Sequence, residues 1–414
     1  MRKPKTIECL YLDFDGFFAS VMQQVYPHLR NKPVGVVPFA GTDRTAVIAC
    51  SKEAKKAGCK NVMKIKDARA ICPSLILVPQ EPDLYRRAHN NLLSEISAII
   101  PIDAIKSIDE LTCRLDASQR KNPQKVAEQI KTRLKKYIGS YITASIGFAP
   151  NRQLAKIAGK QNKPDGVTIW QPDMIPNVLK SLSFDDIPGI GKRMEQRLHR
   201  AQIFTMEQLL NISPKHMRKL WHSVAGERLW YALHGYDIFA QKSERGMFGH
   251  GRVLPPDSRT IKKAKEIARL LLIKAARRLR REGYYAARLV LWLAIRDGSY
   301  SDGLKMPIVN DDKAMLDALD MMWLKVEEKI PHNMIFRLHI TLCDLSFANA
   351  RQIDMFLDDD EERQKWEKIT QAVDSLNKKY SKTIISNGEW KPPKGGNVGG
   401  KISFTRIPNA QDFW

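Results

Sequence analysis

The sequence has few acidic residues relative to its basic ones. Its 414 residues include 45 Asp and Glu against 68 Lys and Arg, which gives a formal net charge of +23 at pH 7. So many positive charges repel one another and destabilise a compact chain unless a polyanion is bound. Nucleic acid is therefore the first partner class that the composition indicates, and an anionic membrane surface is the second. Small acidic substrates alone would not require this charge.

Long apolar runs and paired cysteines are also missing. No window approaches the roughly 18 apolar residues of a membrane span. The N-terminus meets an acidic residue after a short apolar stretch, which argues against a signal peptide. The six cysteines lie far apart without a Cys-x-x-Cys pair, so neither a disulfide framework nor a zinc site is expected. We expect a cytoplasmic protein with no membrane partner and with buried thiols.

The length predicts about three domains, and the first of these alternates strands with helices. Residues 7–12 form an apolar run that predicts a buried strand ending at Asp13, and a helix is expected over 17–25. A strand over 104–115 is interrupted by polar residues, and another strand covers 142–147. This alternation favours an α+β sheet with helices on one face.

The second half of the chain divides into further parts. Short helical pieces over 185–234 predict a small helical domain. The helix predicted over 259–281 contains ten Lys and Arg residues and one Glu. Strands at 286–295 and 334–342 flank a helix at 312–329. The chain then turns acidic and ends in a Gly-, Pro- and Lys-rich tail.

Acidic residues interrupt two of the predicted strands. Asp13 ends the first strand, and Asp109 and Glu110 lie within the second. Carboxylates brought together from adjacent strands repel one another unless a divalent cation such as Mg²⁺ binds between them. A pair of such ions can support phosphoryl transfer. The alternative is that these residues are solvated loop acids.

Several ordered motifs carry a more specific signal. They are YLDFDGFFASV near the start, SKEAKKAG, SIDE at 107–110, SIGFAPNRQLAKIAGKQNKPDG at 145–166 and the following PGIG turn. Through nearly all of residues 7–349 the chain resembles the Y-family translesion DNA polymerases.

The resemblance implies an α+β multidomain fold shaped as a right hand. The expected parts are a palm (1–18 and 81–170), small fingers (19–80), a helical thumb with a helix-hairpin-helix (171–243), an α/β little finger (244–349) and a C-terminal tail (350–414).

The resemblance also assigns the acidic residues. Asp13, Asp109 and Glu110 become the catalytic side-chain ligands of two Mg²⁺ ions, and the backbone carbonyl of Phe14 completes the metal site. Asp15 would be structural. The primer 3′-OH would attack the α-phosphate of a dNTP, and pyrophosphate would leave.

The nucleotide site follows from the same resemblance. Phe17 and Phe18 would contact the nucleotide, with Phe18 as a steric gate against a 2′-OH, although an ordinary helix-core aromatic is the alternative. Lys163 matches a lysine that contacts the triphosphate; otherwise it is a solvated turn residue. Lys52 and Lys55 replace the family's usual Tyr and Arg, which keeps positive charge without a bidentate guanidinium. Otherwise both are solvated helix residues.

Two regions are expected to bind DNA phosphates without reading sequence. One is the hairpin turn, where glycines let backbone amides approach a phosphate, although a tight turn needs glycine anyway. The other is the basic helix, whose alternative is a solvated face. The predicted DNA-binding residues are Gly189, Gly191, Lys192, Arg193, Lys262, Lys263, Arg277 and Arg278, with Arg197 supporting the turn.

A short peptide beyond the little finger resembles the clamp-binding peptide of bacterial polymerases. Gln352, Ile353, Met355 and Phe356 would bind a sliding clamp through few anchors; the alternative is a short helix packed on the domain.

The sequence thus predicts a monomeric translesion polymerase acting on primer-template DNA and dNTPs. The rivals are a catalytically weak or inactive accessory factor that binds DNA and the clamp, and a non-enzymatic DNA-binding module.

Overall fold

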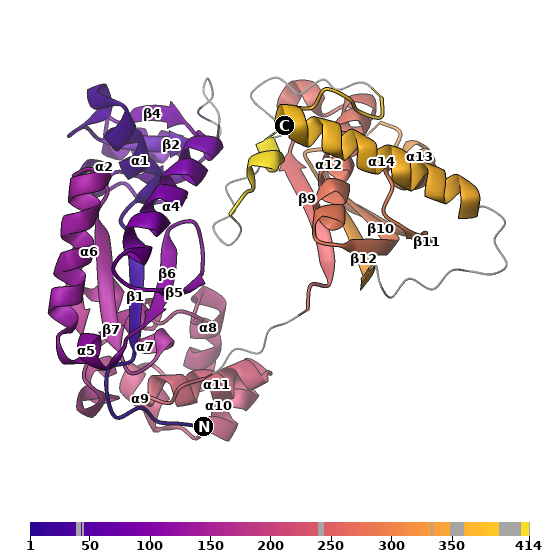
Figure 1. Ribbon diagram of the computed structural model, residues 1–414. Helices are drawn as coiled ribbons and strands as arrows, with labels where there is room; N and C mark the ends of the chain where they lie inside the picture. Colours follow the sequence, from indigo (N-terminus) through magenta and orange to yellow (C-terminus); the bar gives the residue numbers. More distant parts are fainter. Residues whose placement is uncertain are drawn as a thin grey trace. The chain divides into compact units, whose positions relative to one another are not determined.

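The computed structural model describes residues 1–38, 43, 45–238, 244–332, 334–347, 360–388 and 407–413. The chain forms two compact units (Figure 1). The first comprises Met1–Gln241 with Lys401–Pro408, and the second comprises Lys242–Gly400 with Asn409–Trp414. No helix among the described residues is long and apolar enough to cross a membrane.

The first unit is built on a five-stranded sheet with the order β5-β6-β1-β7-β8. Its strands are β1 (Cys9–Phe14), β5 (Ile102–Ile105), β6 (Glu110–Arg114), β7 (Ala144–Ala149) and β8 (Val167–Ile169). The central strand β1 is antiparallel to both β6 and β7, which leaves its polar end between two neighbours.

Helices cover both faces of this palm sheet, so the expectation of helices on one face was wrong. Leu10 and Leu12 of β1 pack in one core with α1 (Phe17–Val25), α4 (Pro82–Ser97) and α6 (Pro123–Tyr137). Cys9 and Tyr11 point the other way, into a core that includes α7 (Arg152–Gln161). Because side chains alternate along a strand, apolar residues on both faces require two covering layers. Asp13 shares the α7 side with Tyr11.

The predicted strand over 104–115 is in fact a hairpin. β5 and β6 are antiparallel, and the backbone amides of Lys106 and Ser107 both donate to the carbonyl of Glu110. Residues 106–109 therefore form the turn between two strands, and Glu110 of the SIDE segment begins β6. Polar residues are placed there because a turn leaves them out of the sheet core.

A small three-stranded sheet forms the fingers, in the order β3-β2-β4. It contains β2 (Val34–Val37), β3 (Ala49–Cys50) and β4 (Ile76–Pro79), with helices α2 (Lys52–Lys56) and α3 (Ile65–Ile71) beside it. Its core is small and is built around Val47, Cys50 and Ile65.

The thumb is helical, as predicted. Its helices are α8 (Lys192–Arg200), α9 (Met206–Asn211), α10 (Pro214–Trp221) and α11 (Val224–Leu233), preceded by the short 3-10 turns Pro172–Met174, Asn177–Leu179 and Phe184–Asp186. Buried thumb residues such as Leu198 and Leu209 share one hydrophobic core with Leu154 and Ile157 of α7. The thumb is thus packed onto the palm through α7.

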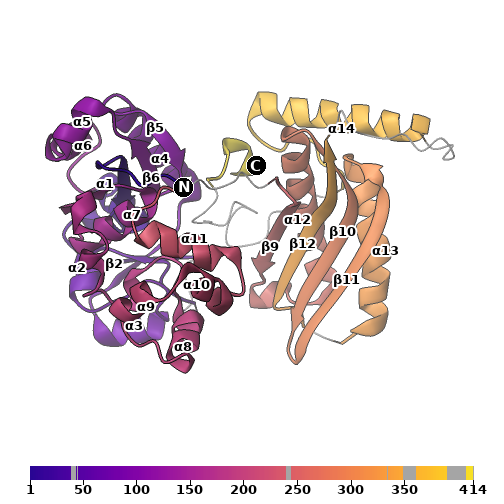
Figure 2. The same cartoon turned by 90° about the horizontal axis from the view of Figure 1, so that it is seen from below.

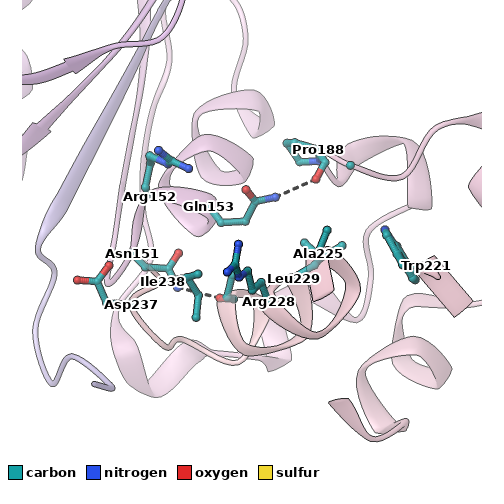
Figure 3. Close-up of a pocket in the computed structure, with 12 residues that line it drawn as sticks. Asn151, Arg152, Gln153, Pro188, Trp221, Ala225, Arg228, Leu229, Asp237 and Ile238 are labelled. Carbon is teal, nitrogen blue, oxygen red and sulfur yellow. Dashed lines mark hydrogen bonds between the residues drawn. The ribbon is translucent and has the colours of Figure 1, made fainter. Parts of the chain in front are cut away.

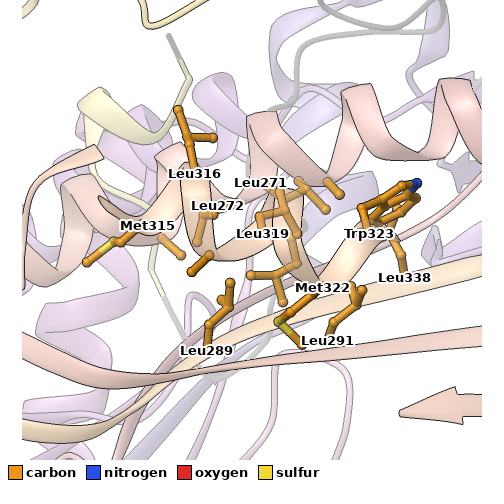
Figure 4. Close-up of a cluster of buried hydrophobic side chains, with 14 of the residues drawn as sticks. Leu271, Leu272, Leu289, Leu291, Met315, Leu316, Leu319, Met322, Trp323 and Leu338 are labelled. Atoms are coloured by element: carbon orange, nitrogen blue, oxygen red, sulfur yellow. The ribbon is translucent and has the colours of Figure 1, made fainter. Parts of the chain in front are cut away.

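The second unit is a four-stranded antiparallel sheet of order β11-β10-β12-β9 packed on helices (Figure 2). Its elements are β9 (Met247–Val253), α12 (Ile261–Arg281), β10 (Tyr284–Ile295), β11 (Gly298–Val309), α13 (Asp312–Lys329), β12 (Arg337–Phe347) and α14 (Asp360–Tyr380). Leucines of β10 interlock with Leu271 of α12 and with Met322 and Trp323 of α13 (Figure 4).

Three elements of this unit were not predicted, namely β9, β11 and α14. β11 contains Gly298, Gly303 and Pro307, residues that argue against a strand, but an edge strand tolerates them. The segment predicted to belong to the tail contains the helix α14, which packs on α13 and buries Thr370 and Asn377. The clamp-peptide residues Gln352, Ile353, Met355 and Phe356 lie outside the described residues.

Candidate active site

The sheet brings the predicted carboxylates together. Asp13 of β1 lies directly opposite Glu110 of β6 in the antiparallel register. The amide of Phe14 donates to the carbonyl of Asp109 at 2.9 Å, so Asp109 is held beside the end of β1. Asp13 near the end of β1, Asp109 in the turn before β6 and Glu110 at the start of β6 therefore meet at one end of these strands.

Each of these carboxylates has a partner of its own. Lys163 Nζ lies 2.5 Å from Asp13 Oδ1, and Lys156 Nζ lies 2.6 Å from Glu110 Oε1. Ser107 donates to Asp109 Oδ1 at 2.5 Å. Lys156 and Ser107 were missed at the sequence level. Two sequence features could have identified them: Ser107 is the first residue of the SIDE motif, and Lys156 lies seven positions before Lys163.

The site is electrostatically costly for its acids. Burial raises the pKa of Asp13 to about 6; Lys163 opposes this rise, and the neighbouring Asp109 and Glu110 add to it. Burial also raises the pKa of Asp109, against the hydrogen bond from Ser107 and with the repulsion of Glu110. A positive charge close to Asp13 and Asp109 therefore stabilises their ionised carboxylates.

The donor set suits a divalent cation. Three carboxylates supply the hard oxygen ligands that Mg²⁺ prefers, and their mutual repulsion is what such an ion relieves. Within the described residues, however, no group of three or more His, Cys, Asp or Glu side chains is arranged to hold a metal as it stands. Lys163 and Lys156 each pair with one of these carboxylates instead.

Comparisons with known proteins decide the family. Residues 12–160 match the model of the impB/mucB/samB family, 185–237 match the DNA polymerase-iota thumb domain, and 245–355 match the impB/mucB/samB C-terminal domain. DNA polymerase IV of Sulfurisphaera tokodaii is 31% identical over 261 residues, covering 61% of this chain and 73% of that protein. DNA polymerase IV 1 of Bacillus subtilis is 29% identical over 391 residues, covering 91% and 92%.

Solved structures agree on the fold. The Y-family DNA polymerase chimera of Dbh and Dpo4 has a TM-score of 0.69 at 24% identity and covers 82% of this chain and 99% of its own. An insertion ternary complex of Dbh DNA polymerase has a TM-score of 0.56 at 24% identity, with 81% and 98% covered.

The chain belongs to the Y family of DNA polymerases. It is a DNA-directed DNA polymerase of the translesion type, and membership of this family implies dependence on a divalent metal ion. The accessory-factor alternative is not favoured, because Asp13, Asp109 and Glu110 are all retained and assembled.

Four of the predicted nucleotide-binding residues of this Y-family polymerase lie on α1 and α2, and the fifth, Lys163, lies just after α7. Phe18 is 1% exposed, with its ring centroid 4.8 Å from that of Tyr85 and 5.5 Å from that of Phe17. A ring so placed packs as a core aromatic, so its role as a gate stays a prediction.

Lys55 of α2 lies close to the start of α1. A side chain placed on Gly16 would have its Cβ 3.0 Å from the carbonyl of Cys50 and 3.8 Å from Lys55 Nζ, and Gly16 has a positive φ of 54°. Glycine is therefore needed for this close approach. Neither Lys52 nor Lys55 forms an ion pair within the described part of the chain, so their charge is available to an anion.

The thumb turn of the polymerase leaves its backbone open. Gly189 has a φ of +107°, and a Cβ on Gly191 would meet no atom within 4 Å. Lys192 and Arg193 are exposed at the start of α8. Arg197 is instead used inside the thumb, where its guanidinium donates to the carbonyl of Leu220 at 2.9 Å. It is therefore not counted among the residues offered to a phosphate.

A cavity of about 450 Å³ lies between the start of α7, the thumb turn and α11 (Figure 3). Gln153 donates across it to the carbonyl of Pro188 at 2.9 Å, and Asn151 donates to the carbonyl of Ala232 at 2.8 Å. Arg152 and Arg228 line the cavity. Neither arginine forms an ion pair among the described residues, and sequence reasoning missed both.

Two of the four predicted DNA-binding residues of the basic helix α12 are covered by other parts of the unit. Arg278 is 7% exposed and donates to the carbonyl of Gly249 at 3.0 Å. Arg277 contacts Asp374 of α14 at 3.6 Å and Thr383 at 3.3 Å. Both are therefore removed from the predicted DNA-binding set, because other parts of the unit cover them. Lys262 and Lys263 are exposed, with Lys263 donating to the carbonyl of Asp257.

The sheet face opposite α12 and α13 carries its own basic residues. Side chains alternate along β10, so Leu289 and Leu291 enter the core while Arg288 and Trp292 point to the other face. Arg337 of β12 lies over the Trp292 ring at 5.8 Å. Sequence reasoning did not identify this face, because the register between strands decides which residues share it.

Proposed function

We propose that this polymerase adds dNTPs to a primer 3′-OH using two Mg²⁺ ions held by Asp13, Asp109 and Glu110, with the backbone carbonyl of Phe14 as a further ligand. The observation that carries the proposal is the register of Asp13 opposite Glu110 with Asp109 hydrogen-bonded beside it. When bound, such ions activate the attacking oxygen and neutralise charge on the triphosphate and the leaving pyrophosphate.

The lysines of the site would neutralise negative charge on the carboxylates and on the triphosphate. Lys163 is held at Asp13, and a triphosphate bound at the same edge would offer its ammonium a second anionic partner. Lys52 and Lys55 would add positive charge near the phosphates, although as point charges they lack the fork of arginine. Lys156 would balance the charge of Glu110 through its ion pair while no metal ion is bound. Phosphoryl transfer depends mainly on such positioning and charge neutralisation.

The fingers side of the site would select the sugar. Phe17 and Phe18 stand at the start of α1, directly after the strand that carries Asp13. We propose that the ring of Phe18 excludes a 2′-OH by steric contact and that Phe17 supports it from the side.

DNA would be held through phosphates in both units. In the first unit the proposed contacts are the open amides at Gly189 and Gly191 together with Lys192 and Arg193, extended by Arg152 and Arg228 at the cavity. Amides at a helix start favour phosphate. In the second unit we propose Lys262 and Lys263 and the sheet face that carries Arg288 and Arg337.

Further partners remain part of the proposal. Gln352, Ile353, Met355 and Phe356 would bind a sliding clamp, and the protein would act as a monomer in the cytoplasm.

The experiment is extension of a primed template with Mg²⁺ and dNTPs. We expect the Asp109→Ala/Glu110→Ala protein to lose at least about a thousandfold in rate, because several kcal/mol of transition-state stabilisation depend on the metal. Asp103→Asn, which changes an exposed carboxylate on β5, is the matched control and should extend normally. Full activity of the double variant would refute the proposed metal ligands.

The gate is tested in the same assay with ribonucleotides. We expect Phe18→Ala to incorporate them while wild type does not. Phe148→Leu, which also shrinks a fully buried palm aromatic, controls for loss of stability. Equal discrimination by Phe18→Ala and wild type would return Phe18 to the role of a core residue.

A further inference from the structure

Asp15, two residues beyond Asp13, is a buried carboxylate with neutral partners. It is 5% exposed. Its Oδ1 accepts from the hydroxyl of Ser145 at 2.7 Å, and its Oδ2 accepts from the hydroxyl of Thr143 at 2.9 Å and from the amide of Asp165 at 2.8 Å. Burying a carboxylate is costly unless its oxygens are hydrogen-bonded. One of these bonds reaches outside the sheet, to the turn that follows α7.

That turn is tightly constrained. Asp165 adopts a positive φ of 59°, a conformation that is uncommon outside glycine although Asp adopts it more readily than most residues. A Cβ on Gly166 would come within 1.7 Å of the carbonyl of Asn162, so only glycine fits there. Lys131 of α6 forms an ion pair with Asp165 at 3.0 Å. The turn therefore keeps this shape because outside contacts hold it.

The same turn carries Lys163 to the active site. Lys163 stands two residues before Asp165, and its ammonium lies 2.5 Å from Asp13 Oδ1. Asp13 thus pairs with the Lys163 ammonium. Asp15 accepts a hydrogen bond from the backbone of the turn that carries Lys163.

We propose that Asp15 is a positioning residue for Lys163: by binding the Asp165 amide it holds the turn that aims the ammonium at Asp13 and at the triphosphate of the incoming nucleotide. The inference rests on the proposed contact between Lys163 and the triphosphate. It differs from a purely structural role for Asp15, which would stabilise the palm without affecting the nucleotide.

The test is a double-mutant cycle on full-length protein, with KM for dNTP and kcat measured in primer extension. Asp15→Asn keeps the shape of the side chain but removes its charge and one of its two acceptor oxygens, which weakens the hydrogen bond from the Asp165 amide. We expect KM to rise about tenfold with a smaller change in kcat, as expected when a group that orients substrate is misplaced. In the Lys163→Ala background, Asp15→Asn should add no further increase, because the residue through which it acts is absent.

Ser145→Ala is the matched control, since it removes the partner of Oδ1 and leaves the bond from Oδ2 to the turn. It should lower the melting temperature without raising KM. If the increases in KM caused by Asp15→Asn and Lys163→Ala multiplied in the double variant, Asp15 would not act through Lys163. The proposed contact of Lys163 with the triphosphate would still stand. An unchanged KM in Lys163→Ala would instead refute the triphosphate contact on which the inference rests.

A second variant covers the case in which Asp15→Asn does not fold. Lys131→Gln removes another anchor of Asp165 from a partly exposed position. It should raise KM in the same direction, and only when Lys163 is present. A KM equal to that of wild type in Lys131→Gln would then count against the proposal.

Discussion

Lys156 Nζ lies 2.6 Å from Glu110 Oε1, and the two side chains are only 27% and 20% exposed. The lysine is contributed by α7 and the acid by β6, so the pair joins a helix on one face of the palm sheet to the strand that carries the acids. The ammonium also lies 5.1 Å from the centre of the Tyr11 ring. Lys156 is therefore a built-in counter-charge for the carboxylate cluster.

Replacing Lys156 should lower the stability of the metal-free protein and raise its affinity for Mg²⁺. In Lys156→Gln three acids face one cation fewer, so we expect the metal-free protein to lose about 1 kcal/mol of stability. The same change removes a competitor for Glu110, so Mg²⁺ should raise the melting temperature of the variant more than that of wild type. Thermal unfolding with and without Mg²⁺ measures both effects. A smaller Mg²⁺ shift in the variant would show that Lys156 instead helps to hold the ligands in place.

The pKa of Asp13 predicts an unusual pH dependence of stability. Burial raises this pKa from 3.8 to about 6, so between about pH 4 and 6 the folded protein binds more protons than the unfolded chain. Stability therefore falls as the pH rises through that window, and above it the ionised carboxylate costs free energy.

Asp13→Asn should remove that cost in metal-free buffer. We expect the variant to be more stable than wild type by about 1–2 kcal/mol at pH 8, with the difference disappearing below about pH 4. Denaturant unfolding with a chelator across this pH range is the measurement. Asp103→Asn, at an exposed position of β5, should show no such trend. A variant less stable than wild type at pH 8 would mean that the ion pair with Lys163 outweighs burial.

The exposed cations of the thumb turn predict a salt effect. Lys192→Gln and Arg193→Gln should each weaken binding to primed DNA and lower the slope of log Kd against log salt by about 1, because each phosphate contact releases counterions. Titrations at several salt concentrations measure the slope. Lys313→Gln changes a lysine that forms an ion pair with Asp317 in α13, and it should leave the slope unchanged. If Lys192→Gln and Arg193→Gln both gave the wild-type slope, as Lys313→Gln should, the turn would not contact DNA phosphates.

A buried ion pair holds the second unit together. Arg280 of α12 donates to Asp312 of α13 at 2.7 Å, with side chains 7% and 4% exposed, and it also meets Asp374 of α14 at 2.7 Å. Asp312→Ala should cost about 3 kcal/mol, because the buried Arg280 guanidinium then keeps only Asp374 of its two carboxylate partners. Asp320→Ala on the same helix removes an exposed pair with Lys265 and should change stability by less than about 1 kcal/mol. Chemical unfolding of both proteins decides between these values.

Much of this molecule could be predicted from local patterns. The apolar run before Asp13, the helix at 312–329 and the helical thumb were all recognisable, because burial periodicity and turn residues are local properties of the sequence. The motifs around Asp13, SIDE and Lys163 also identified the family and its acids. Each of these signals lies within a short stretch of chain.

Tertiary structure decided the partners of those residues. Lys156 and Ser107 joined the site, and Arg277 and Arg278 left the predicted DNA surface, because strand register and helix packing determine which side chain meets which. A basic helix has the same composition whether its arginines face solvent or a covering helix such as α14. The sequence therefore determined which chemistry the protein carries, and only the packing of distant segments decided where each charge is used.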